Sequence, residues 1–245
     1  MKLAFSILSI ISFSILLSSC EPEDIIFGKH VKGTGDIINK TRNFNAFVEI
    51  EVANNSDVEV YKSSTQTVEV SDYENIIKYT QASVEGNRLV IKTEPENINI
   101  SNSKSKVIIH VPSLKVLHLS GSGNIILKDD FTEVAKVSIS GSGNIENRKP
   151  CNFKDLNISI SGSGDIQIKG TANNVATEIS GSGDINLAEL LSQNARCSIS
   201  GSGNTTVSVN TNLDAQISGS GDIEYYGHPS VISSISGSGS VTKAK

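Results

Sequence analysis

The tetrapeptide Ser-Gly-Ser-Gly recurs through the second half of the chain, and this repeat constrains the fold more than any other feature. Its seven copies are 18 to 21 residues apart. They begin at Ser120, Ser140, Ser161, Ser180, Ser200, Ser218 and Ser236. Spacing this regular indicates an architecture of stacked structural repeats, in which each repeat contacts only its neighbours.

Apolar and polar residues alternate on both sides of each tetrapeptide. Around Ser180, for example, Ile179 precedes the turn, and Ile185 and Leu187 follow it. A period of two predicts a β-strand with one buried face on each side of a glycine corner. Each repeat of ~20 residues is then one coil of a parallel β-solenoid. We expect the corner glycines to stack tightly and to take positive φ angles.

The segment before the repeats has less regular strand patterns. Alternation predicts strands at 47–52, 58–61, 67–70 and 88–92, and the residues from Glu74 to Tyr79 suggest a short helical turn. We therefore expect an all-β protein in two parts. An N-terminal β region, 33–112, caps a parallel β-helix, 113–245, and no flexible linker separates them.

The first 32 residues have the pattern of a targeting signal followed by a linker. Residues 1–19 have a basic start and an apolar run that is typical of a secretory signal peptide. The sequence Leu-Ser-Ser before Cys20 resembles the lipobox of bacterial lipoproteins, which implies lipidation of Cys20 and anchoring in the membrane. An ordinary signal peptide with an incidental cysteine is the alternative.

An acidic run, Glu21-Pro22-Glu23-Asp24, opens the linker at 20–32. It resembles the surface-export signal of Bacteroidetes lipoproteins, and a solvated acidic linker is the competing interpretation. The predicted location is the cell envelope, lipid-anchored at the outer membrane, with surface exposure if the acidic run acts as an export signal.

Residues 33–245 resemble the bacterial family called putative auto-transporter adhesin, head GIN domain. The resemblance rests on the opening Gly33-Thr34-Gly35-Asp36-Ile37, on Arg88-Leu89-Val90-Ile91, and on the repeated Ile-Ser-Gly-Ser-Gly-Asn/Asp-Ile. It implies an all-β fold that ends in a right-handed parallel β-helix, in secreted or lipid-anchored envelope proteins. It transfers no binding residue to this chain.

A column of Asn and Asp follows the tetrapeptides. Its members are Asn124, Asn144, Asp165, Asp184, Asn204 and Asp222. A cation ladder is one interpretation, but calcium prefers six to eight oxygen ligands and half of this column is amide. We expect instead a structural ladder, in which each side chain bonds the local backbone to complete its turn. No metal or cofactor is predicted.

The sequence offers little catalytic chemistry. Asp165 and Asp184 could form the carboxylate pair of a glycosidase, but only Lys169 and Arg196 supply nearby cations, and no aromatic residue lies close in sequence. The stacked serines have no repeated histidine partner that could activate a nucleophile. We therefore predict a protein that is not an enzyme.

Two cysteines follow Cys20. Cys197 falls in an inward-facing position, whereas Cys151 has a different phase and lies about two coils away, or ~10 Å along the axis. A disulfide tolerates Cα separations up to ~7 Å. We predict two free thiols.

The formal net charge is −5 and no basic cluster is present, which argues against nucleic-acid binding. The favoured function is a non-catalytic adhesin or surface-binding protein, with a carbohydrate or protein ligand along the solenoid. The alternatives are a structural envelope protein that self-associates through its solenoid ends, and a polysaccharide-acting enzyme. The sequence leaves the ligand and the oligomeric state open.

Overall fold

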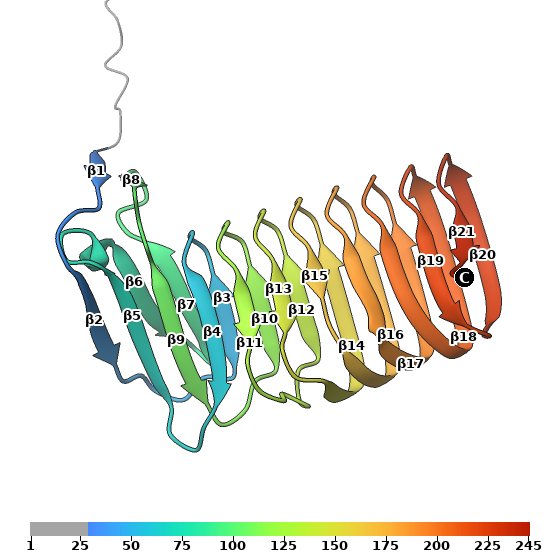
Figure 1. Cartoon of the computed structure of the whole chain (residues 1–245), viewed down its shortest axis with the longest axis horizontal. Coiled ribbons are helices and arrows are strands. Elements are labelled where there is room, and N and C mark those ends of the chain that lie inside the picture. The colour runs from blue at the N-terminus through green and yellow to red at the C-terminus, as the bar shows by residue number, and fades with distance from the viewer. Residues whose placement is uncertain (1–28) are drawn as a thin grey trace, which may run out of the picture.

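The computed structural model describes residues 29–245, which form one elongated stack of β-strands (Figure 1). The only helix in this range is the 3₁₀ turn η1 (Ile77–Tyr79), within the segment where the sequence predicts a helical turn. The predicted all-β solenoid is therefore confirmed. Between residues 29 and 245, no helix has the length and apolar character that a membrane span requires.

Each coil contributes one strand to each of two long faces. The descending face contains the strands that follow the corners. These are β4 (Asp57–Lys62), β11 (Ile125–Leu127), β13 (Ile145–Asn147), β15 (Ile166–Gln167), the first halves of β17 (Ile185–Ile199) and β18 (Thr205–Gly219), β19 (Ile223–Gly227) and β21 (Val241–Lys243). The ascending face contains the strands that lead into the corners. These are β3 (Glu49–Val52), β10 (Val116–Leu119), β12 (Lys136–Ile139), β14 (Cys151–Ile160), β16 (Gly170–Ile179), the second halves of β17 and β18, and β20 (Ser230–Gly237).

Parallel pairing keeps equivalent positions in register from coil to coil. The isoleucines before the corners stack directly on one another and are at most 2% exposed. They are Ile139, Ile160, Ile179, Ile199 and Ile217. Burying one such side chain contributes about 1.5–3 kcal/mol. The core is therefore a narrow apolar seam between the two faces, as the alternating pattern predicts.

Both cysteines in the described range lie in this seam. Cys197 stacks between Thr177 and Ala215 and is fully buried. Cys151 is 1% exposed and pairs with Gly170 on the next coil. Both thiols are free, which confirms the prediction.

The corner glycines are required by close stacking. A Cβ built on Gly143 would lie 1.7 Å from the carbonyl oxygen of Gly123 in the preceding coil. The other corner glycines give the same contact at 1.8 to 2.2 Å. The expectation of positive φ was wrong, because among these corners only Gly237 has it, with φ of 137°. Lack of space, rather than backbone conformation, excludes a side chain here.

The N-terminal region extends both faces. On the descending side, β9 (Lys106–Val111) runs parallel to β4, and β5 (Thr67–Tyr73) and β2 (Ile37–Arg42) continue the sheet antiparallel. On the ascending side, β7 (Arg88–Thr93) runs parallel to β3 and pairs with β6 (Thr80–Glu85). A short pair, β1 (His30–Lys32) with β8 (Asn99–Ser101), lies at one edge. The predicted strands at 47–52, 58–61, 67–70 and 88–92 correspond to β3, β4, β5 and β7.

The boundary predicted at residue 112 is not marked by a change of geometry. Strands β3 and β4 form a coil of their own, which stacks in parallel register on β10 and β11. Asn54, Asn55 and Ser56 stand at its corner in place of the glycine tetrapeptide. The division into a cap and a solenoid stays a prediction.

The two ends of the apolar seam differ. At the N-terminal end the segment around η1 covers it, and Ile76 and Ile77 are fully buried there. At the C-terminal end every residue of β20 is exposed. In the described part of the chain, nothing covers this last coil.

Candidate functional site

The column of Asn and Asp side chains forms a hydrogen-bonded chain that runs along the solenoid. Each Oδ1 accepts the backbone N–H of the equivalent residue one coil further on, at 2.7 to 3.1 Å. The chain starts at Asp57 and ends at the N–H of Ser240. Between them it passes through Asn124, Asn144, Asp165, Asp184, Asn204 and Asp222. We call this chain the corner ladder.

The ladder differs from the expectation in one respect. Its bonds connect successive coils, whereas the sequence suggested bonds within each turn. Only the Oδ1 acceptor is needed, so Asn and Asp are interchangeable as links. Where an asparagine follows, its amide often adds a second bond, as from Asn124 Nδ2 to Asp57 Oδ1 at 2.8 Å. At each Asp the other carboxylate oxygen has no such role in the ladder.

Asp57 is the member of the ladder that sequence analysis missed. No glycine tetrapeptide precedes it, so a search for the repeat cannot find it. The signal is in the strand that follows, because Val58 and Val60 pair with Ile125 and Leu127 of the first repeat coil. Alignment on apolar spacing alone would have placed Asp57 in the column.

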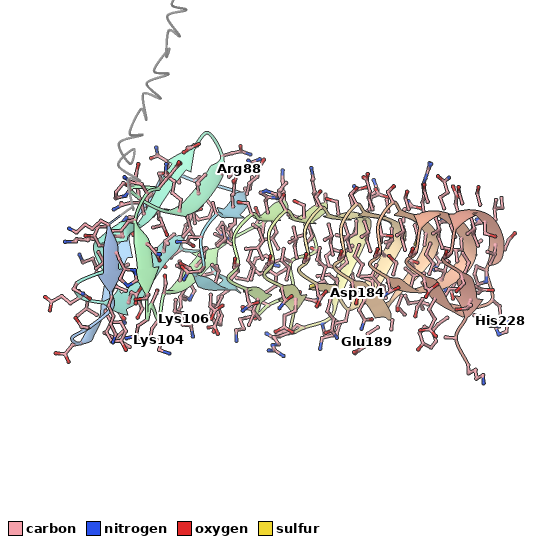
Figure 2. All side chains as sticks on the ribbon, turned by 90° about the horizontal axis from the view of Figure 1, so that it is seen from above. Arg88, Lys104, Lys106, Asp184, Glu189 and His228 are labelled. Atoms are coloured by element: carbon pink, nitrogen blue, oxygen red, sulfur yellow. The ribbon has the colours of Figure 1, made fainter. Side chains whose placement is uncertain are left out.

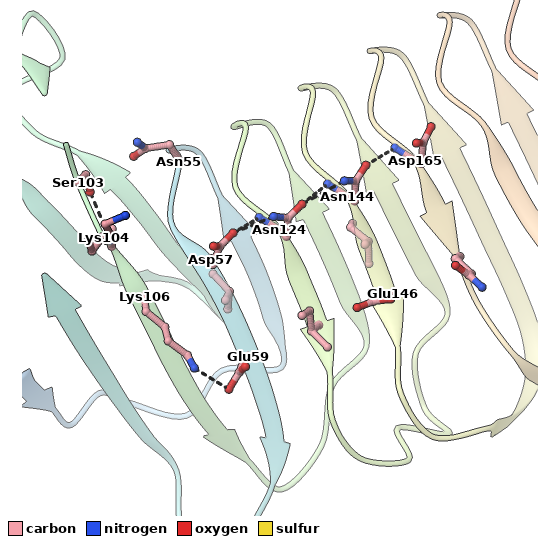
Figure 3. A pocket seen from close by; sticks show the side chains of 15 residues that line it. Asn55, Asp57, Glu59, Ser103, Lys104, Lys106, Asn124, Asn144, Glu146 and Asp165 are labelled. Atoms are coloured by element: carbon pink, nitrogen blue, oxygen red, sulfur yellow. Dashed lines mark hydrogen bonds and ion pairs between the residues drawn. The ribbon is translucent and has the colours of Figure 1, made fainter. Parts of the chain in front are cut away.

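A groove of about 840 Å³ lies against the first links of this ladder (Figure 3). One wall is the ladder itself, and the other is the segment that leads into β9. The floor is the outer surface of β4, β11, β13 and β15. The polar lining residues are Asn55, Asp57, Glu59, Ser103, Lys104, Ser105, Lys106, Asn124, Asn144, Glu146, Asp165 and Gln167. We call this site the ladder groove.

Charges of both signs meet at one end of the ladder groove. Glu59 receives Lys106 Nζ at 3.2 Å, Lys128 Nζ at 3.0 Å and the Tyr61 hydroxyl at 3.0 Å. Burial would raise the pKa of Glu59, but the hydrogen bonds from Lys128, Tyr61 and Lys106 outweigh it and hold this pKa below its ordinary value. Glu59 is therefore ionised at neutral pH and fixes both lysines in place.

The ladder groove contains more acids than bases. Its acids are Asp57, Glu59, Glu146 and Asp165, and its bases are Lys104 and Lys106. Figure 2 shows both lysines on the side of the stack opposite Arg88. Carboxylate oxygens and amide groups thus dominate the lining, and no aromatic side chain lines it.

The structure does not unite Asp165 and Asp184 in one pocket. Asp165 lines the ladder groove and Asp184 does not. The Oδ1 of Asp165 is occupied by the backbone N–H of Asp184 at 2.9 Å. Residues 29–245 contain no group of three or more His, Cys, Asp or Glu side chains placed to hold a metal ion. The predicted lipidation site, Cys20, lies outside the described residues.

A serine–histidine pair on the ascending face also escaped sequence analysis. His118 Nδ1 lies 2.8 Å from Ser138 Oγ, and the two residues are register partners on β10 and β12. Burial lowers the pKa of His118. Neither residue lines the ladder groove, and Ser138 is only 8% exposed. The His118–Ser138 pair is therefore a contact between neighbouring strands and not part of the ladder groove.

A second ladder of amides runs along the ascending face. Asn174 donates to Asp155 at 2.7 Å, Asn194 to Asn174 at 3.0 Å, and Asn212 to Asn194 at 2.8 Å. A shallow cavity of about 410 Å³ adjoins it. The signal in the sequence is a recurrence of Asn at the coil spacing, outside the glycine motif.

The chain is similar to several solved structures over nearly its whole length. A putative adhesin from Bacteroides fragilis covers 87% of this chain with all of its own, at 22% identity and a TM-score of 0.80. A putative lipid binding protein from Parabacteroides distasonis covers 89%, also with its whole length, at 28% identity and a TM-score of 0.72. A putative adhesin from Parabacteroides merdae covers 89% with its whole length, at 25% identity and a TM-score of 0.73. A search of curated proteins returned no match.

A family model spans residues 46–229, which is most of the chain and includes the ladder groove. The strand pairs and repeated corners described above fill this range. The chain therefore belongs to the family described as "Putative auto-transporter adhesin, head GIN domain".

Proposed function

We propose that this protein is a non-catalytic, adhesin-like component of the bacterial cell envelope that binds an extended polar ligand in the ladder groove. The observation that carries the proposal is the groove itself. It presents carboxylate and amide groups in a row, at the spacing of the coils, on a rigid scaffold. Membership in an adhesin-like family agrees with a binding role at the cell surface or envelope.

Carbohydrate fits this lining best. A sugar hydroxyl both donates and accepts, so it can bond a carboxylate oxygen and an amide in turn. The second carboxylate oxygens of Asp57 and Asp165 and the amides of the half-buried Asn124 and the exposed Asn144 offer both kinds of partner. A protein loop with polar side chains is the competing ligand. An acyl chain fits poorly, since charged groups line the groove, although one solved relative is described as a putative lipid binding protein.

The test is a binding measurement on a glycan array with a matched pair of ladder variants. Asn144 lines the ladder groove, whereas Asn204 has the same links in the ladder but lies outside the groove. We expect Asn144→Ala to lose glycan binding and Asn204→Ala to keep it. Equal losses would show that the ladder matters only for stability, and an array without signal would count against carbohydrate as the ligand.

The attachment to the membrane is proposed to pass through lipid on Cys20. Cys20→Ala is expected to release the protein from the membrane fraction or to leave the precursor unprocessed. Membrane retention with normal processing would refute lipid anchoring. Protease treatment of intact cells then separates the surface location from the periplasmic one.

The absence of catalysis is tested separately. Incubation with bacterial and host polysaccharides should leave their chain lengths unchanged, because Asp165 and Asp184 do not share a pocket. Depolymerisation that is lost in Asp165→Asn would overturn this part of the proposal.

A further inference from the structure

The last coil of the solenoid has the features of an unfilled interface. Strand β20 carries no charged residue, and three of its apolar side chains are exposed. These are Val231 at 37%, Ile232 at 73% and Ile235 at 46%. Val231 and Ile235 continue the inward rows that are buried in the preceding coils, where Leu213 and Ile217 are 1% and 2% exposed.

The backbone of β20 also has free hydrogen-bonding groups at this edge. In a parallel sheet, a residue directs its N–H and its C=O to the same neighbouring strand, and the next residue directs both groups to the strand on the other side. In earlier coils the first serine of the corner donates to the coil before it, as Ser200 does to Ile179 O at 2.7 Å. By the same register Ile232, Ser234 and Ser236 face β18, which leaves Val231, Ser233 and Ile235 directed at the open edge.

We propose that a second copy of this chain covers this edge, with the two β20 strands antiparallel and centred on Ser233. In that register each Val231 faces the partner's Ile235, and the two Ser233 residues face each other. These are the residues whose backbone groups are free, so each facing pair exchanges both of its hydrogen bonds. The same register joins the two apolar seams, since all three side chains point inward. If the two-fold axis passed through a residue other than Ser233, Val231 would no longer face the partner's Ile235.

Charge favours the same arrangement. Residues 230–245 contain Lys243 and Lys245 and no acid. Lys243 Nζ lies 3.0 Å from His228 Nδ1, in the bend between β19 and β20, which Figure 2 places at the end of the stack. The two-fold axis brings each bend opposite the partner's last corner. There the nearest acid is Asp222, which accepts the N–H of Ser240. In the proposed pair the lysines of the two copies therefore lie at opposite ends of the shared edge, each at the end where the partner's last corner lies.

The experiment is cysteine cross-linking of the full chain on membranes, resolved on a non-reducing gel. In Ser233→Cys the two new thiols face each other across the axis, with Cα atoms about 5.5 Å apart, which is within the range of a disulfide. The matched control is Ser234→Cys, because the partner's residue 234 lies diagonally at about 7–8 Å. Cys151 and Cys197 are buried and do not compete.

We expect oxidation to convert Ser233→Cys to a disulfide-linked dimer and Ser234→Cys to remain monomeric. Adding Ile235→Lys to Ser233→Cys should abolish the dimer, with circular dichroism confirming that the fold is kept. Equal cross-linking of the two cysteine variants, or none in either, would overturn the proposal. So would cross-linking of Ser233→Cys to a different protein, which would identify another occupant of the same edge. Glycan binding in the ladder groove is measured independently, so either proposal can fail alone.

Discussion

Replacement of Gly181 by alanine tests the stacking of the corners most directly. The new Cβ would lie 2.0 Å from the carbonyl oxygen of Gly162 and 3.0 Å from its carbonyl carbon. A comfortable C···O contact is about 3.3 Å, so the two coils must separate by roughly 1.3 Å at this corner. Crowding of this kind costs about 1–3 kcal/mol.

The same displacement stretches two backbone hydrogen bonds. Ser180 N–H donates to Ile160 O at 2.8 Å and Ser182 N–H donates to Gly162 O at 3.0 Å, and both bonds connect these two coils. Each contributes about 1 kcal/mol. The total is then about 3–5 kcal/mol, and the Tm of a chain of this size falls by about 2–4 °C per kcal/mol. We expect Gly181→Ala to melt roughly 6–20 °C below the parent.

The assay is thermal unfolding followed by circular dichroism, with Ser182→Ala as the matched control. Ser182 is exposed in the same corner. Its Tm should stay within about 2 °C of the parent, as is usual for surface changes. If Gly181→Ala melted together with Ser182→Ala, the close approach of the two coils would be incorrect.

Three further outcomes follow from the described contacts. Asp184→Asn should keep the Tm of the parent, because an amide oxygen can accept the Asn204 N–H that Asp184 accepts at 2.7 Å, whereas Asp184→Ala should lower the Tm by about 2–4 °C. Added calcium should not change the Tm of either variant. A large calcium-dependent rise in Tm would make the ladder a cation site. Because the folded pKa of Glu59 is lowered, its ionised form stabilises the protein above the unfolded pKa of about 4.3, and this stability is lost as pH falls through the folded value. The Tm of the parent should thus fall more steeply between about pH 5 and pH 3 than that of Glu59→Gln, and parallel curves would refute the role of its cation pairs. Burial raises the pKa of Cys197 to about 11, so this thiol should resist a disulfide reagent at pH 8 until the protein unfolds; rapid labelling of the native state would contradict its burial.

The repeats made the solenoid predictable, because period-two alternation around a fixed glycine motif leaves one physical solution. The strands and the inward position of Cys197 follow from that pattern alone. The corner backbone did not follow, since glycine is used both for positive φ and for close approach, and spacing does not distinguish them. Gly143 takes the second role, with no room for a Cβ beside Gly123.

The ladder groove was harder to predict than the fold. The wall formed by the ladder could be predicted in part, because Asn124, Asn144 and Asp165 belong to the column of Asn and Asp that repeats in the sequence. The opposite wall comes from residues around Lys104 and Lys106, which reach the site only because β9 pairs with β4, whose register partners are 49 positions earlier in the chain. Pairings of that kind depend on the tertiary arrangement of the N-terminal region, which carries no repeat to reveal it.

The position of β1 has a mechanical consequence for the tethered binding protein that we propose. Tension applied at the N-terminal end of the described chain enters through β1, whose three residues pair with β8. From β8 the chain runs directly into the wall of the ladder groove at Ser103 and Lys104. A load on a ligand held by the Ser103 and Lys104 wall therefore reaches the N-terminal end through a few residues of β8 and β1. We expect the three-residue β1–β8 pair to yield first, whatever the length of the rod beyond it.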